Sequence, residues 1–173
     1  LQGLPRDARA AQVHLTASEW CAALGRSEEA RQHLEVAVLQ GAGGAAALKR
    51  LAEQYEAEGT WPEAAATFTW FAGQAEDPAE RAAAWRRAVE LYAERVGDPA
   101  QAAAMAERAL QDEPGAADLL LRVAELEVEV GAPARILRAC ERVGAVLGAP
   151  ALSPFRLPFA RALQASGRGA EAV

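Results

Sequence analysis

The sequence predicts an all-helical protein built from tandem helical hairpins. Alanine supplies about a quarter of the 173 residues, and Ile136 is the only isoleucine, so the composition favours helices over strands. Glycines recur at spacings of 34 to 38 residues, at Gly25, Gly59, Gly97, Gly131 and Gly167. Apolar residues with the helical period precede and follow each of these glycines. Each glycine is therefore expected to end one helix at a turn before the next.

The first repeat is expected over residues 11–44, and residues 1–10 are expected to be the tail of an earlier repeat. Two helical stripes define the first repeat, one on each helix. Their members are His14, Ala17, Ser18 and Cys21 on the first helix, and Ala30, Leu34 and Ala37 on the second. Ser27 is expected to be the N-cap of the second helix.

The second repeat, residues 45–81, has the clearest pattern. Its two stripes are Leu48, Leu51, Ala52 and Tyr55, then Ala64, Phe68 and Phe71. Between them, Thr60 and Glu63 have the spacing of a capping box, and Pro62 suits the first turn of a helix. A second helix is therefore expected to start at this point.

The third repeat, residues 82–116, follows the same plan with insertions. Its stripes are Trp85, Ala88, Val89 and Tyr92, then Ala102, Ala106 and Ala109, with Pro114 closing the repeat. Asp98 and Pro99 are expected to be the N-cap and first residue of its second helix. One extra residue lies between Tyr92 and Gly97, and three more lie around Asp77 and Pro78. These insertions explain the longest glycine spacing.

The last repeats are less regular. The fourth is expected over residues 117–152, and a partial fifth over residues 153–173. The stripes of the fourth are Leu120, Val123, Ala124 and Glu127, then Ile136, Cys140 and Val143; the fifth keeps Phe159, Ala160 and Leu163. Glu127 stands where the second and third repeats have a tyrosine, so the packing of the fourth repeat is expected to differ.

These residues resemble the tetratricopeptide repeat, whose pattern joins Leu, a small residue and Tyr to a turn glycine, then Ala, Phe, Ala and a closing Pro. The resemblance covers nearly the whole chain, about four and a half repeats of a longer array. It implies a right-handed superhelical solenoid of antiparallel helix-turn-helix repeats. It also implies that the first helix of each repeat lines a concave groove, where family members hold peptides or partner helices.

From the resemblance, a charged row is expected to face that groove. Its members are Lys49, Arg50 and Glu53, then Arg86, Arg87 and Glu90, then Arg122, Glu125 and Glu129. One interpretation is that the arginines bind acidic groups or a C-terminal carboxylate of a partner. The other is that Lys49 with Glu53, and Arg86 with Glu90, form i,i+4 pairs on a solvated surface. The Lys, Asn and Arg clamp of some family members is not reproduced, because the chain has no asparagine.

Most tryptophan, histidine and cysteine side chains are expected to pack between helices rather than to bind a ligand. Trp85 and Trp61 are expected between helices, whereas Trp20 and Trp70 lie off the stripes and are possible anchors for a partner. His14 is expected to pack. Cys21 and Cys140, which lie several repeats apart, are expected to fill the core without forming a disulfide.

Composition and motifs argue against several function classes. A net charge of −6 disfavours nucleic-acid binding, and no apolar run reaches the ~18 to 20 residues of a membrane span. No set of nucleophile, base or metal ligands can be assembled from two histidines and two cysteines, so we expect no enzyme activity, cofactor or metal. Because the chain starts at Leu1 without methionine, we expect a segment of a longer protein; a cytoplasmic location is favoured, but an upstream targeting signal would not be seen.

The leading hypothesis is a protein-interaction scaffold or adaptor that binds a partner peptide or helix in its groove. An alternative is a structural spacer or self-association element that builds a larger assembly through its terminal or lateral faces. A third is a regulatory repeat region of a larger multidomain protein. The partner itself is not identified by any motif.

Overall fold

The computed structural model describes residues 6–168, with side chains from Arg9 onward, and contains helices and no strand over that range. The elements in chain order are α1 (Arg6–Ala23), α2 (Ser27–Leu39), α3 (Gly44–Glu58), α4 (Trp61–Gln74), α5 (Pro78–Glu90), the π-helix η1 (Leu91–Val96), α6 (Pro99–Asp112), α7 (Ala117–Val130), α8 (Pro133–Leu147), the 3₁₀-helix η2 (Ala149–Phe155) and α9 (Arg156–Ala165). The all-helical class predicted from the sequence is confirmed. The chain divides into two compact units, residues 1–84 and 85–173, whose boundary lies within α5.

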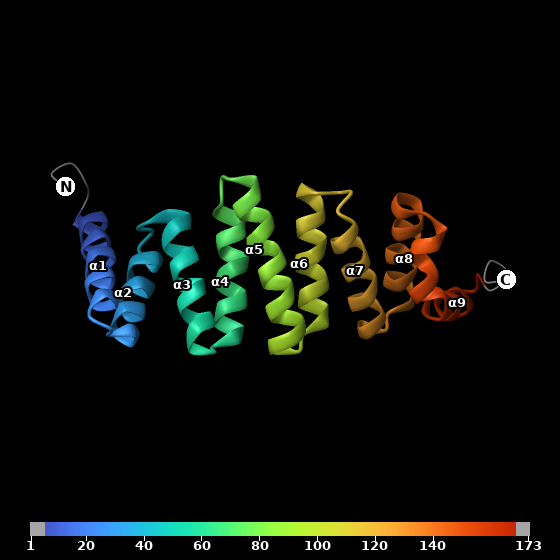
Figure 1. The fold of residues 1–173 in the computed structure, drawn as a ribbon, viewed down its shortest axis with the longest axis horizontal. Coiled ribbons are helices and arrows are strands. Elements are labelled where there is room, and N and C mark those ends of the chain that lie inside the picture. The colour runs from blue at the N-terminus through green and yellow to red at the C-terminus, as the bar shows by residue number, and fades with distance from the viewer. Residues whose placement is uncertain (1–5, 169–173) are drawn as a thin grey trace. The chain divides into compact units, whose positions relative to one another are not determined.

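Unit 1 is a series of antiparallel helices in which each packs against the next. Figure 1 shows α1 to α4 in this order, and α1 packs on α2, α2 on α3, and α3 on α4. The predicted stripes of the second repeat form the centre of this unit. Those that are buried are Leu48, Leu51, Ala52, Ala64, Phe68 and Phe71. Small alanines on α3 and α4 let the two helices approach closely while the two phenylalanines fill the space.

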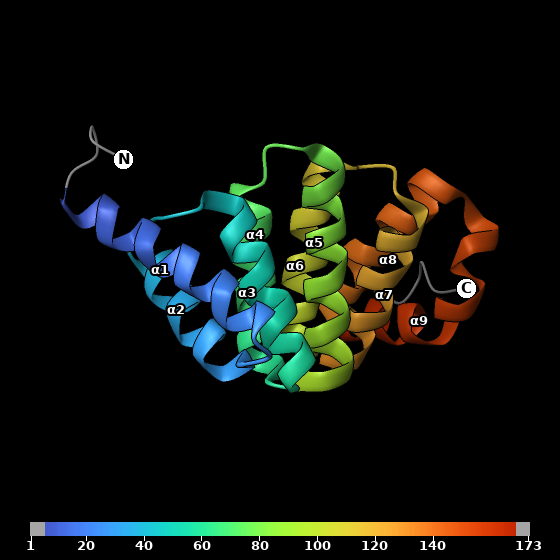
Figure 2. The ribbon, with the colours of Figure 1, turned by 60° about the vertical axis from the view of Figure 1, so that its left-hand side comes forward.

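Unit 2 has the same serial packing. In it, α6 packs on α7, α7 on α8, and α8 on both η2 and α9, as can be followed from α6 to α9 in Figure 2. Most members of the predicted stripes are again buried, whereas Tyr92 is half-buried. The buried members are Trp85, Ala88, Val89, Ala102, Ala106, Ala109, Leu120, Val123, Ala124, Ile136, Cys140 and Val143. Each helix therefore buries one apolar stripe against its neighbours.

The helix caps agree with the sequence only in part. Asp98 is the N-cap of α6, and its Oδ1 accepts a hydrogen bond from Gln101 N at 2.9 Å, as predicted. Thr60 occupies the predicted N-cap of α4, but its hydroxyl donates to Tyr55 O at 3.0 Å, so the predicted capping box is wrong. Ser27 is the first residue of α2 rather than its cap, which is Arg26.

The extra residue between Tyr92 and Gly97 is accommodated as a π-helix. Over Leu91–Val96 the helix changes from the α to the π form, and Gly97 follows it in the left-handed conformation at φ 73°. Asp98 N donates to Tyr92 O at 2.8 Å and closes this widened turn. A single inserted residue fits a π-turn because the turn holds one residue more than an α-turn.

The outer repeats differ from the expected stripes. The helix α1 begins at Arg6, so residues 6–10 extend the first helix of the first repeat rather than ending an earlier one; the expected tail over residues 1–5 lies outside the described residues. On α1 the buried side chains are Ala11, Leu15 and Ser18, whereas His14, Ala17 and Cys21 are half-buried. In the fifth repeat Phe155, Ala162 and Leu163 are buried, and Phe159 and Ala160 only half-buried.

Candidate partner-binding surfaces

In unit 1, the predicted charged row lies on α3. Lys49 and Arg50 are half-buried and Glu53 is exposed. Lys49 Nζ lies 2.8 Å from Glu80 Oε1 on α5, and Arg50 Nη1 lies 3.0 Å from Glu19 Oε1 on α1. The hydrogen bond to Glu80 raises the pKa of Lys49. The expected pairing of Lys49 with Glu53 is therefore replaced by ion pairs that join the first helices of successive repeats.

In unit 2, Arg86 makes the most extensive ion pairs of the row. Its Nη2 lies 2.8 Å from Glu113 Oε2, and its Nε lies 3.0 Å from Asp118 Oδ2. These hydrogen bonds raise the pKa of Arg86 and lower the pKa of both carboxyl groups. The expected pairing with Glu90 is thus wrong for Arg86, whose two partners lie toward the next repeat.

Two arginines of the row pair within their own helices. Arg87 Nη1 lies 2.5 Å from Glu90 Oε2, and Arg122 Nη1 lies 3.1 Å from Glu125 Oε2. Arg122 also has Glu94 Oε1 at 3.7 Å. Both arginines keep part of their surface open, with side chains 41 and 32% exposed.

The row together with its partners therefore carries more negative than positive charge. Its five basic side chains all have carboxylate partners, which outnumber them, and Glu53 and Glu129 add further exposed negative charge. These pairs are half-exposed and stabilise the fold only modestly, because water screens them.

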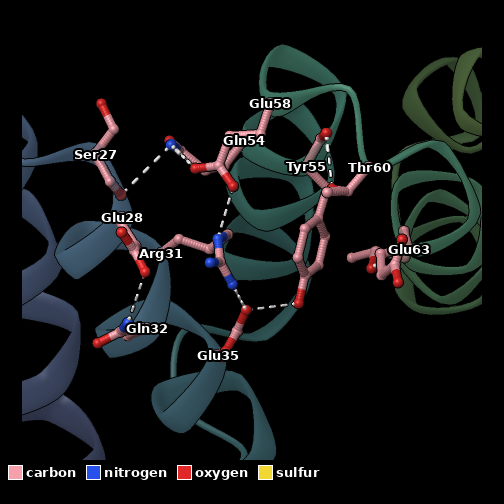
Figure 3. Close-up of polar contacts among 11 residues, drawn as sticks. Ser27, Glu28, Arg31, Gln32, Glu35, Gln54, Tyr55, Glu58, Thr60 and Glu63 are labelled. Atoms are coloured by element: carbon pink, nitrogen blue, oxygen red, sulfur yellow. Dashed lines mark hydrogen bonds and ion pairs between the residues drawn. The ribbon is translucent and has the colours of Figure 1, made fainter.

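A second polar cluster in unit 1 links the first and second repeats. In Figure 3, Arg31 of α2 lies between Glu35 and Glu58, and the Tyr55 hydroxyl points at Glu35. Arg31 Nε lies 2.7 Å from Glu58 Oε2, and Tyr55 Oη donates to Glu35 Oε1 at 2.8 Å. Burial and the Glu35 hydrogen bond raise the pKa of Tyr55 to about 12. The tyrosine of the repeat pattern thus fastens its helix to the helix before it.

The corresponding place in the fourth repeat is a polar cavity. Glu127 on α7 is only 5% exposed, and Arg135 Nε of α8 donates to its Oε1 at 2.9 Å. Beside this pair lies a cavity of about 500 Å³ within unit 2. It is lined by Glu107, Glu127, Arg135, Arg138, Ala139 and Arg142. We call it the α8 arginine cavity.

Tryptophans occupy both buried and exposed positions. Trp85 is buried, as predicted, and Trp61 is half-buried. Trp20 and Trp70 are 69 and 46% exposed, as their positions off the stripes allowed. Trp20 and the exposed Val13 border an apolar hollow of about 460 Å³ on α1.

Histidines and cysteines form no metal cluster over the described part of the chain, where no three His, Cys, Asp or Glu side chains gather around a common point. His14 Nδ1 lies 2.9 Å from His33 Nδ1, which places the two rings between α1 and α2. Cys21 and Cys140 are free thiols, and burial raises the pKa of Cys140 to about 11. Between residues 6 and 168, no helix combines the length and apolar character that a membrane crossing requires.

The α8 arginine cavity was not predicted from the sequence. The glutamate at position 127, where other repeats have a tyrosine, predicts different packing but not a cavity. A usable signal was present in the next helix, where Arg135, Arg138 and Arg142 follow at i, i+3 and i+7 and so share one face.

Comparison with known proteins identifies the fold. No family model and no curated protein matches the chain. Among solved structures, it is similar to YrrB, a TPR protein with an unusual peptide-binding site, at 11% identity and a TM-score of 0.52 over 92% of this chain and 79% of that one. It is also similar to the MamA protein, at 15% identity and a TM-score of 0.50 over 94 and 86% of the two chains. The fold is therefore that of the tetratricopeptide repeats, as the sequence predicted.

Proposed function

We propose that this chain is a non-enzymatic protein-interaction scaffold that binds a peptide or helix of a partner protein along the charged row of its first helices. One observation carries the proposal. Arg50, Arg87 and Arg122 occupy the same register of three successive first helices, each five residues before the position of Tyr55, Tyr92 or Glu127. Each has a side chain that is about a third exposed or more, at 39, 41 and 32%.

The arginines of this row have the chemistry to bind carboxylate groups of a partner. A guanidinium group has five N–H donors, and one carboxylate occupies at most two of them well. Part of each of these side chains is exposed beside its carboxylate partners, and there a carboxylate from another chain would bind. YrrB, which has the same fold, contains a peptide-binding site, and this supports peptide binding as the class of function.

The test compares two charge reversals in unit 2. The first is Arg87→Glu with Arg122→Glu in the row, and the matched control is Arg108→Glu with Arg161→Glu at exposed positions outside it. Partners captured from lysate by the unaltered chain are identified by mass spectrometry and titrated by calorimetry. We expect the row variant to weaken the binding of an acidic partner at least tenfold and the control to change it little. Equal affinities for both variants would reject the row, provided circular dichroism shows unchanged helicity.

Self-association is a second candidate, favoured by the outer face of α1. Val13 and Trp20 there are 65 and 69% exposed. The equivalent positions of the fourth repeat, aligned on the turn glycines, are Leu119 and Leu126 of α7, which are buried in a helix that packs against both α6 and α8. The α1 face thus has the character of a surface that another helix covers.

Light scattering separates the two candidates. If α1 mediates self-association, Trp20→Lys converts an oligomer of the unaltered chain into a monomer, because a charged side chain replaces an apolar contact. A monomeric unaltered chain that still captures a partner would exclude self-association.

A further inference from the structure

The position occupied by Tyr55 in the second repeat is occupied by a glutamate, Glu127, in the fourth repeat. Tyr55 and Glu127 both lie four residues before the turn glycine of their repeats. In unit 1, the Tyr55 ring extends toward the preceding second helix and its hydroxyl binds Glu35. In unit 2, the equivalent of Glu35 is Glu107, but Glu127 has no ring to extend toward it. At this place Glu127 is one of the residues that line the α8 arginine cavity.

The charges of the cavity are arranged so that one cation remains available. Arg135 is held by Glu127, and Arg142 Nη1 lies 2.8 Å from Glu107 Oε2. Arg138 lies between these two pairs on the same face of α8, is exposed, and has no hydrogen bond or ion pair with any residue that the structure describes. Three guanidinium groups and two carboxylates leave a net charge of +1 in the cavity.

The two ion pairs also fix the walls. Arg135 and Arg142 are each only about a third exposed, at 36 and 35%, so their guanidinium groups are held in place on either side of Arg138. A preorganised set of this kind binds an anion with less loss of side-chain freedom than three mobile arginines would. The single net positive charge matches a carboxylate better than a dianion.

We infer that the α8 arginine cavity is a second binding site, in which Arg138 receives a carboxylate group of an acidic polypeptide. The guanidinium group of Arg138 donates two parallel N–H bonds to the carboxylate oxygens, the geometry that arginine forms best. Arg135 and Arg142 line the same cavity and add positive charge around the bound carboxylate. This inference rests on the proposed function, since it names a further surface for a protein partner.

The carboxylate has two possible sources, a Glu or Asp side chain or a chain terminus, and two probe peptides distinguish them. The first peptide alternates Glu and Ser and is acetylated and amidated, so that only side chains carry charge. The second is an acetylated Gly-Ser peptide whose only charge is its C-terminal carboxylate. A peptide that alternates Gln and Ser, with both ends blocked, measures binding without charge.

Calorimetry at low salt compares the unaltered chain with Arg138→Glu, Arg138→Lys and the control Arg108→Glu, which makes the same charge change at an exposed position of α6. We expect one of the carboxylate peptides to bind the unaltered chain and the Gln peptide not to. Arg138→Glu is expected to weaken that binding by about tenfold or more and Arg138→Lys by less, because lysine keeps the charge but loses the paired donors. Arg108→Glu is expected to change it less than twofold.

Two results would overturn the assignment. One is that neither carboxylate peptide binds the unaltered chain. The other is that Arg108→Glu and Arg138→Glu weaken binding equally, which would indicate a diffuse field rather than a site. Failure of the proposed function looks different: the chain would bind a carboxylate peptide through Arg138 yet capture no partner protein through the row of Arg87 and Arg122.

Discussion

Tyr55 and Glu127 show how one position of a repeat can serve either packing or polar chemistry. Both side chains lie where a first helix meets the second helices around it. Tyr55 keeps an aromatic ring in this space and hydrogen-bonds Glu35 at 2.8 Å. Glu127 is buried as a carboxylate and depends on Arg135 for its counter-charge. A buried carboxylate without such a partner would cost several kcal/mol, so the two residues act as a pair.

The raised pKa of Tyr55 predicts an alkaline dependence of stability. Its pKa is about 12 in the folded chain and about 10 in the unfolded chain. The folded state keeps the phenol proton longer, so this contribution is fully present below pH 10 and is lost as the pH rises toward 12. We expect the free-energy advantage of the unaltered chain over Tyr55→Phe to fall by about 2 kcal/mol over that interval.

Urea denaturation of both chains at successive pH values measures this effect. Other groups also lose protons at alkaline pH, but they do so in both chains. Their contributions therefore cancel when the unfolding free energy of one chain is subtracted from that of the other. A difference that stays constant from pH 9 to 12 would mean that Tyr55 ionises equally in the folded and unfolded states.

At the scale of the helix, the crowded surroundings of Gly43 predict that adding one methyl group there lowers the stability of the fold. Gly43 is the N-cap of α3 at φ 78°, and a Cβ there would lie 2.6 Å from Ala47 Cβ and 2.9 Å from Leu15 Cδ1. Gly41 has a similar φ of 75° but no atom within 4 Å of such a Cβ. Both alanine variants bear the left-handed strain of about 1 to 2 kcal/mol. Only Gly43→Ala adds crowding, so we expect it to be less stable than Gly41→Ala by about 1 kcal/mol or more.

Chemical denaturation followed by circular dichroism provides the comparison. If the two variants were equally stable, α1 and α3 would have to separate at this point without cost, and the close packing of Leu15 on the α3 cap would be disproved.

The helices themselves were predictable because their stripes and turn glycines are local features of the sequence. Asp98 was also predictable, since an aspartate before a proline has few other roles at a helix start. Thr60 was not, because a hydroxyl can either accept from a backbone N–H at the helix start or donate to a carbonyl, and here it donates to Tyr55 O. The ion-pair partners of Lys49 and Arg86 were missed for a related reason. Carboxylates about 30 residues away come close only once the repeats have packed.

For the whole molecule, serial packing predicts that a destabilising substitution in one unit has little effect on the stability of the other. Successive helices pack against one another among α1 to α4 and among α6 to α9, and the chain divides into two compact units. Stability in such an array is approximately a sum of local terms. We expect Gly43→Ala to accelerate hydrogen exchange of the amides in α1 to α4 and to leave those of α6 to α8 nearly unchanged, as followed by mass spectrometry.

Equal acceleration in both units would instead mean that the chain opens as one cooperative body. The superhelical arrangement of the whole array and its concave groove stay predictions from the resemblance. They depend on small rotations between successive repeats, which no single residue of the sequence specifies.

The π-helix at Leu91–Val96 has a consequence for how this chain tolerates changes in length. A residue inserted into an α-helix would ordinarily rotate everything beyond it by about 100°. Here the added residue is taken up within one turn, and Gly97, Asp98 and Pro99 still begin the next helix as they would in a repeat of ordinary length. The insertion of a residue at the end of a first helix can thus be accommodated without displacing the apolar stripe of the helix that follows.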